Sequence, residues 1–261
     1  MSLSYDLATT QILWRRDLLR FFRRKSRLLG ALIQPLLFWL LIGGGMASTF
    51  RLEGVEGLDY ESYFFPGILV MMVLFAAIFG TITVIEDRHQ GFLQSVLVAP
   101  SSRGALVLGK TLGVASVGLV QGGLFLLLAP WAGFPFAAID WPLLLLGLSL
   151  GAVSLSALGF ALAWWLDSSQ AYHAIMSALL LPGWILSGAM FPLSAEQPVL
   201  SVLMRWNPMS YIVEVVRGAF YPGGLPAGLG LGVSSTVAIL VLGAFTLSSL
   251  AWATWICYRR R

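Results

Sequence analysis

The sequence has few charged side chains and a single cysteine, and both shortages restrict the kinds of protein it can be. Only 11% of the 261 residues are Asp, Glu, Lys or Arg, whereas 58% are hydrophobic and the mean hydropathy is +0.84. These values lie outside the range of soluble globular domains and indicate a membrane protein. The one cysteine, Cys257, excludes an internal disulfide and gives no indication of redox chemistry.

Long stretches contain no acidic or basic residue at all. A helix needs roughly 20 mostly apolar residues to cross the hydrocarbon core of a bilayer, and six stretches reach that length. They run approximately over Leu28–Thr49, Ser62–Ile85, Thr111–Trp131, Trp141–Leu166, Ser169–Met190 and Leu229–Ile256. We therefore expect an all-α integral membrane protein with six transmembrane helices, its membrane domain covering residues 28–258.

The absence of ionisable groups from these stretches argues against an ion-coupled secondary carrier, which normally keeps such groups inside the membrane. The carrier nevertheless stays an alternative. His173, near the inner end of the fifth stretch, is expected to face lipid headgroups instead of relaying protons. Gln34 and Gln121 lie in otherwise apolar helices, where they either bond neighbouring helices or line a substrate path. They are the candidate path residues.

Basic residues are concentrated where a cytoplasmic location is expected. Of sixteen, seven precede the first stretch, three lie between the second and third, and three end the chain. The positive-inside rule then places both termini in the cytoplasm. Residues 1–27 read as a cytoplasmic amphipathic interfacial helix and 259–261 as a basic tail, with no cleavable signal peptide expected. The net charge of +4 fits this topology and anionic lipid, without a nucleic-acid partner.

One motif imitates a nucleotide-binding site. The sequence "RGALVLGKTLG" places Gly104, Gly109, Lys110 and Thr111 at the spacing of a phosphate-binding loop. Such a loop follows a buried strand in a soluble domain, whereas Thr111 leads directly into an apolar run of membrane-spanning length. We therefore expect no cofactor, metal or catalytic site here, and we expect Lys110 to mark the membrane edge with its ammonium among the headgroups.

The segment "IEDRHQGFLQSVLVAPSSRGALVLGKTLG" joins the second and third stretches. Apolar residues at helical spacing and acids at the start predict a short amphipathic helix over Asp87 to Ala99, ended by Pro100. A helix of this kind on the inner membrane surface suits docking to a partner.

This segment resembles the cytoplasmic loop of type-2 ABC exporter permeases, particularly the daunorubicin-resistance-like branch. The matching order is an acidic-basic pair, Gly, an apolar helix, "APxSR" and "LGK", and "YFFPGILVMMVLFAAIFG" and "NPMSYIVEVVRGAFY" resemble further family elements. In that family the loop, here about 86–110, carries the coupling helix that sits in a groove of the ATPase. The resemblance assigns this role to Glu86, Asp87, Arg88, His89, Gly91, Phe92, Leu93, Leu97, Pro100 and Arg103.

The resemblance also implies the partners and the location. It predicts a prokaryotic inner-membrane permease that pairs with a second copy of itself and with two copies of an ABC ATPase subunit, which would hold the ATP and Mg²⁺. It further implies that Pro- and Gly-rich outer segments between the fifth and sixth spans re-enter the membrane. A transport pathway lined by spans that are poor in charge suits an amphiphilic or hydrophobic cargo, such as a drug, a lipid or a lipid-linked glycan.

One enzyme class stays open as an alternative. Glu86, Asp87 and His89 lie within four positions at the inner surface, and three titratable side chains could serve a lipid-modifying enzyme as acid and base. On a helix, however, these side chains spread around the axis, and they could equally contact a partner protein.

Overall fold

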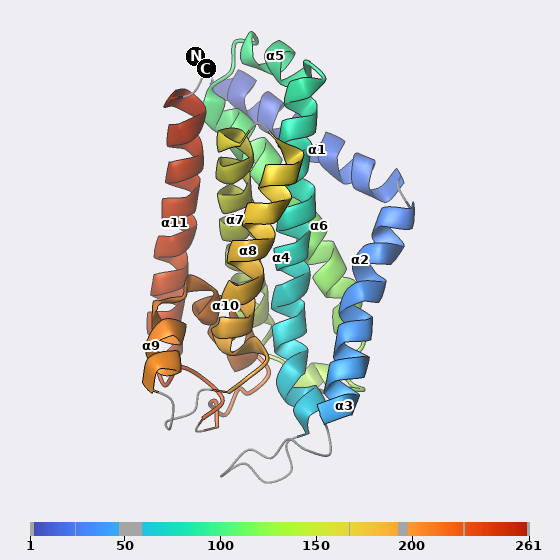
Figure 1. The fold of residues 1–261 in the computed structure, drawn as a ribbon, viewed down its shortest axis with the longest axis vertical. Helices are drawn as coiled ribbons and strands as arrows, with labels where there is room; N and C mark the ends of the chain where they lie inside the picture. The colour runs from blue at the N-terminus through green and yellow to red at the C-terminus, as the bar shows by residue number, and fades with distance from the viewer. Residues whose placement is uncertain are drawn as a thin grey trace.

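The chain folds into a helical bundle, described here from a computed structural model for residues 3–23, 25–46, 59–166, 168–192, 198–226 and 228–259 (Figure 1). No strand occurs within these ranges. Several predictions fall outside them, namely those for residues 1–2 and 24, the end of the first stretch (47–49), the acidic segment 51–58 and the tail residues 260–261. The helices are α1 (Leu3–Arg23), α2 (Lys25–Phe38), η1 (Trp39–Gly43), α3 (Gly44–Met46), α4 (Tyr60–His89), α5 (Phe92–Leu97), α6 (Arg103–Leu126), η2 (Phe136–Ala138), α7 (Trp141–Trp165), α8 (Ser169–Trp184), η3 (Ile185–Ala189), α9 (Pro198–Trp206), α10 (Pro208–Gly218) and α11 (Ser235–Arg259).

Within the described ranges, five helical segments are long and apolar enough to cross a membrane. They are α4, α6, α7, the continuous α8–η3 segment and α11. The predicted first span is represented by α2, η1 and α3, whose apolar part covers only Leu32–Met46. Pro35 inside α2 cannot donate a backbone hydrogen bond, and the helix widens to a π-turn from Trp39 onward.

Two predicted span boundaries were wrong. The third helix begins at Arg103 instead of Thr111, with Ser102 as its N-cap, and it ends at Leu126. The last helix begins at Ser235, and the preceding six residues are not helical. Both starts were predicted from the absence of charged residues. That criterion fails for the third helix because the helix extends beyond its apolar part, and it fails for the last helix because the first apolar residues are not helical.

The bundle has two distinct ends. The α5 end carries α5, the start of α1 and the end of α11, whereas the α9 end carries α3 and α9 (Figure 1). Helix α4 runs through the middle of the bundle and is buried along most of its length.

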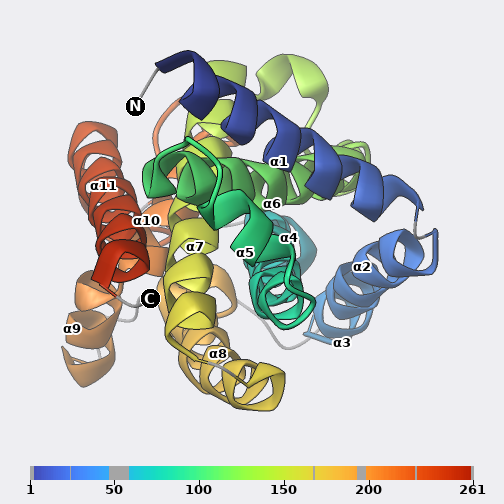
Figure 2. The same cartoon turned by 90° about the horizontal axis from the view of Figure 1, so that it is seen from above.

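Helix α1 lies across α6 at the α5 end (Figure 2). Two glycines permit this close approach. A Cβ atom on Gly109 would lie 2.9 Å from the Cβ of Leu13, and one on Gly113 would lie 3.0 Å from the Cβ of Asp17. Of the two glycines in the phosphate-loop motif, Gly109 therefore serves helix packing, and Gly113 does so one turn further along α6.

At the α9 end, α10 holds irregular backbone in place. Gly188 has a left-handed conformation with φ 80°, and its carbonyl accepts hydrogen bonds from Tyr63 (2.6 Å) and Arg217 (2.8 Å). Arg217 also donates to the carbonyl of Leu229, and Glu214 accepts from the N–H of Leu231. Three backbone groups of this region, the carbonyls of Gly188 and Leu229 and the N–H of Leu231, are thereby paired with side chains inside the protein.

Candidate functional site

The predicted coupling helix is shorter than expected and begins later. Helix α4 continues through His89, so Glu86, Asp87, Arg88 and His89 form its last turn instead of the first turn of a separate helix. The chain then turns at Gly91, whose φ of 75° suits glycine, and α5 has only six residues. The prediction of one helix over Asp87 to Ala99 was wrong because it missed this left-handed break.

Five charged side chains meet directly beside α5, and we call them the five-charge cluster. They are Arg16, Asp17 and Arg20 from α1, Asp87 from α4 and Lys110 from α6. Arg16 binds Asp87 with both terminal nitrogens, at 2.7 and 2.8 Å, and Arg20 adds a contact at 3.1 Å. The Lys110 ammonium lies 2.5 Å from Asp87 and 3.1 Å from Asp17. The cluster thus joins three helices that are distant in sequence.

The prediction for Lys110 was wrong, because its side chain is fully buried and does not reach the headgroups. Asp87 is buried to the same degree. A buried ion is costly unless charged or hydrogen-bonding partners surround it, and here each buried ion is in contact with opposite charges. Burial raises the pKa of Asp17, and the neighbouring Lys110 and Arg16 oppose that rise.

Helix α5 is attached to the cluster through its first residues. The guanidinium of Arg16 lies 3.7 Å from the ring centroid of Phe92, which is a cation–π contact. Leu93 is buried in the core. Leu97 and Val98, in contrast, are exposed, Val98 to 85%. The outward apolar surface therefore comes from the end of α5, and Leu93 belongs to the packing underneath.

The two arginines that flank α5 turn toward the bundle. Arg88 donates to the carbonyl of Trp164, and Arg103 donates to the carbonyls of Cys257 and Tyr258. Pro100 is exposed in the turn that leads to α6. The resemblance assigned Arg88 and Arg103 to the coupling loop, and the structure places both guanidinium groups against helix ends of this same chain.

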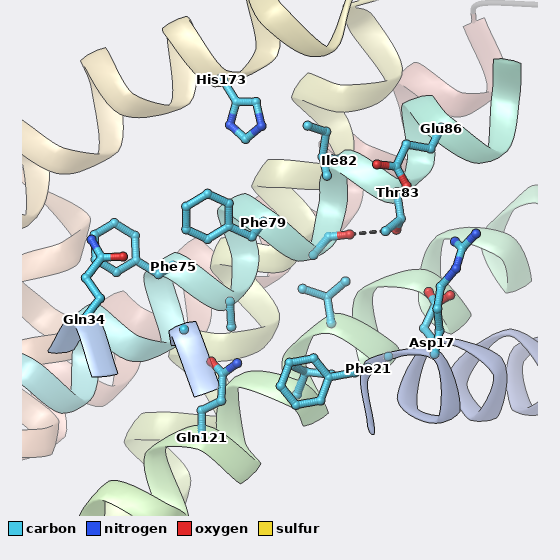
Figure 3. A pocket seen from close by; sticks show the side chains of 17 residues that line it. Asp17, Phe21, Gln34, Phe75, Phe79, Ile82, Thr83, Glu86, Gln121 and His173 are labelled. Atoms are coloured by element: carbon cyan, nitrogen blue, oxygen red, sulfur yellow. Dashed lines mark hydrogen bonds between the residues drawn. The ribbon is translucent and has the colours of Figure 1, made fainter. Parts of the chain in front are cut away.

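A cavity of about 320 Å³ lies next to the cluster. Helices α1, α2, α4, α6 and α8 contribute to its wall, and the side chains labelled in Figure 3 point toward it. Its α5-end wall carries the charged groups of Asp17, Arg20 and Glu86, whereas aromatic rings dominate the middle. The aromatic lining residues are Phe21, Phe75, Phe79 and His173.

Both candidate path residues line this one cavity. Gln34 comes from α2 and Gln121 from α6, although 87 positions separate them in the sequence. His173 lines the cavity beside Phe79, with ring centroids 5.9 Å apart, and the expectation that it faces lipid headgroups stays a prediction. The sequence analysis favoured bonding between helices for these two amides and kept path lining as the alternative. Both line the cavity, and their role in a substrate path stays a prediction.

The proposed acid-base trio does not share a site. Glu86 lines the cavity, Asp87 is buried in the five-charge cluster, and His89 is exposed at the end of α4. The sequence reasoning also missed Asp17, which lies in both the cluster and the cavity wall. The sequence contained an indication that Asp17 has a specific partner, because Asp6 and Asp17 are the only two acids within the strongly basic first 27 residues.

Comparison with known proteins agrees with the resemblance. Residues 8–221 match the family model described as ABC-2 type transporter. Nodulation protein J of Sinorhizobium fredii is 28% identical over 243 residues, covering 89% of this chain and 88% of the relative. A protein of Cyanophora paradoxa named as a transport permease, ycf38, is 27% identical over 212 residues, covering 79% of this chain and 72% of the relative.

The family match covers most of the chain. The described part of the chain contains five membrane-length helices, which is the architecture of a multi-pass membrane protein. Relatives named as transport permeases support a transport role in place of an enzymatic one. The chain therefore belongs to the ABC-2 type transporter family.

Proposed function

We propose that this chain is the permease subunit of an ATP-driven exporter that moves an amphiphilic or hydrophobic molecule outward. ATP and Mg²⁺ would be held by a separate ATPase subunit, present in two copies, and the permease would pair with a second copy of itself. In this proposal α2, η1 and α3 provide the sixth span, and α9 and α10 form the re-entrant outer segments. The α5 end then faces the cytoplasm of a prokaryotic cell, with both termini inside.

One observation carries the proposal: the five-charge cluster and the cavity share side chains. Asp17 and Arg20 belong to the cluster that adjoins α5, and they also form part of the cavity wall. A displacement of α5 would act on Arg16 through Phe92 and then on the shared residues. The geometry therefore supports a short mechanical connection between a partner bound at α5 and the space around a cargo.

The cavity supports an amphiphilic cargo because its wall changes in character along its length. Charged groups lie at the α5 end, aromatic rings follow, and the amides of Gln34 and Gln121 add hydrogen-bonding groups. Its volume is at the lower end of the range for small-molecule sites, roughly 300–1,000 Å³. An apolar body with a few polar groups would satisfy this wall, whereas a hydrated inorganic ion would not.

Transport into inside-out vesicles that contain the permease–ATPase complex tests the function. ATP should drive uptake of a fluorescent amphiphile, and Gln34→Leu and Gln121→Leu should change which amphiphiles are taken up while the amount of assembled complex stays constant. Gln170→Leu is the control, because Gln170 is exposed and does not line the cavity. ATP-independent uptake, or variants at positions 34 and 121 that match the control, would contradict the proposal.

A further inference from the structure

Two arginines flank α5 in the sequence, and each contacts the end of a different helix. Arg88, in the last turn of α4, donates to the carbonyl oxygen of Trp164 at 2.9 Å. Its guanidinium also lies 4.6 Å from the ring centroid of Trp164. Trp164 is the penultimate residue of α7, so Arg88 caps the α5 end of that helix.

Arg103, the first residue of α6, makes the corresponding contact with α11. Its Nη1 atom lies 2.5 Å from the carbonyl oxygen of Cys257 and 3.2 Å from that of Tyr258. The guanidinium is also 5.6 Å from the ring centroid of Tyr258. Both carbonyls belong to the last turn of α11, which ends at Arg259.

These contacts are well suited to hold helix ends. The last four carbonyl groups of an α-helix have no partner within the helix, and the helix dipole makes that end partly negative. An arginine satisfies the carbonyls and complements the dipole at once, while its planar group can stack on a neighbouring aromatic ring. The segment between the two arginines is therefore tied at one side to α7 and at the other to α11.

Helices α7 and α11 also pack against each other along the bundle. The two arginines thus connect α5 to one helix pair, whereas Arg16 and the five-charge cluster connect it to α1, α4 and α6. The two sets of contacts use different side chains, although Arg88 shares α4 with Asp87 and Arg103 shares α6 with Lys110. They differ in the helices reached, which are α7 and α11 for the two arginines and α1 for the cluster.

Resting on the proposed function, we propose that Arg88 and Arg103 are positioning residues that transmit displacement of α5 to the ends of α7 and α11. Arg88 acts on α7, and Arg103 acts on α11. The connection is separate from the five-charge cluster, so its loss should disconnect one helix end at a time while the partner ATPase remains bound at α5.

Hydrogen–deuterium exchange on the full permease–ATPase complex tests this, with and without a non-hydrolysable ATP analogue. In the wild type, the nucleotide should change exchange in α5 and at the ends of α7 and α11 together. Arg88→Ala should remove the nucleotide response at α7 only, and Arg103→Ala at α11 only, with the response of α5 preserved. Cargo transported per ATP hydrolysed should fall by roughly 2- to 30-fold in each variant, the range of measured coupling effects.

The nucleotide-induced difference separates transmission from simple fraying, since fraying raises exchange equally in both nucleotide states. Arg259→Ala is the matched control, because Arg259 stacks on Trp255 of its own helix at 4.9 Å. Arg103→Lys keeps a charged donor and should therefore retain part of the nucleotide response at α11. This variant replaces Arg103→Ala if the alanine variant does not assemble with the ATPase.

A nucleotide response at α11 that persists in Arg103→Ala, or equal transport per ATP hydrolysed in that variant and in the control, would overturn the proposal. A wild-type complex without any nucleotide response in α5 would instead contradict the proposed function. The two failures are therefore distinguishable.

Discussion

Asp87 is the residue on which most charged contacts at the α5 end converge. It is fully buried and binds Arg16 and Arg20 from α1 and Lys110 from α6. Within the five-charge cluster, removing its charge leaves three cations with Asp17 as the one remaining carboxylate. The side chain therefore holds α1, α4 and α6 together more than any other single group in the cluster.

We expect Asp87→Asn to lower the free energy of unfolding by about 3–5 kcal/mol, the usual cost of leaving buried charges uncompensated. Asp17→Asn should cost less, because burial already raises the pKa of Asp17 and thus disfavours its charged form. Denaturant unfolding of the purified protein in detergent measures both. Glu86→Gln, at the adjacent and less buried position, should change stability by no more than about 0.5 kcal/mol. Equal losses in all three variants would refute this ranking.

The same residues show why local pattern was insufficient for the site. Lys110 reads as a membrane-edge lysine because its sequence neighbours are apolar, yet its partners lie 23 and 93 positions away. A pairing of that kind leaves no periodic signal. Gln34 and Gln121, in contrast, were identifiable because a polar amide in an apolar helix stands out from its surroundings.

Helix α5 is a short element whose two faces have different roles. Leu93 faces the core and Phe92 contacts Arg16, whereas Leu97 and Val98 are exposed at its far end. The exposed face is the part available to a partner, so docking and folding can be altered independently.

Val98→Asp should leave the permease folded but weaken its complex with the ATPase by about 3 kcal/mol, or on the order of 100-fold in Kd, because a charge would be buried at the contact. Leu93→Asp should instead prevent folding of the loop. Affinity measurement by titration of the purified ATPase, together with the melting temperature of each permease variant, distinguishes the two effects. Wild-type affinity for Val98→Asp would place the ATPase contact elsewhere.

Helix boundaries were predictable from the sequence where the charge-free stretch and the helix end at the same residues. Helix α7 follows the charge-free stretch closely, since Asp140 caps its start and the chain leaves the helix after Trp165. The break at Gly91 was not predictable from composition, because the residues on both sides continue the helical spacing and only the positive φ interrupts it. Helix α6 likewise begins earlier than its apolar part, at Arg103. Its two basic residues have partners inside the protein, since Arg103 donates to a carbonyl of α11 and Lys110 binds buried carboxylates.

At the scale of the molecule, the distribution of basic residues predicts which end of the bundle faces the cytoplasm. The α5 end carries α1 with its arginines, whereas the α9 end carries exposed apolar and aromatic side chains. Trp206 at the end of α9 is 85% exposed, and Phe136 in η2 is 41% exposed. These positions are suitable for labelling.

In a Cys257→Ser background, single cysteines replacing Phe136 and Trp206 should react with an impermeant thiol reagent added to intact cells, and one replacing Gln90 should not. The reason is the positive-inside rule applied to the α5 end. Permeabilised cells provide the control, because the cysteine at position 90 must then react. Labelling at position 90 in intact cells would reverse the orientation.

The order of the charges along the chain has a consequence for synthesis. Arg16 and Arg20 precede Asp87, whereas Lys110 follows it. A ribosome makes both arginines first, so two cations are already available when the aspartate of the nascent chain arrives at the membrane. The lysine, in turn, enters a site where Asp17 and Asp87 have both been made. Neither buried ion has to wait for its first counterion, which removes an obstacle to inserting charged residues during biogenesis.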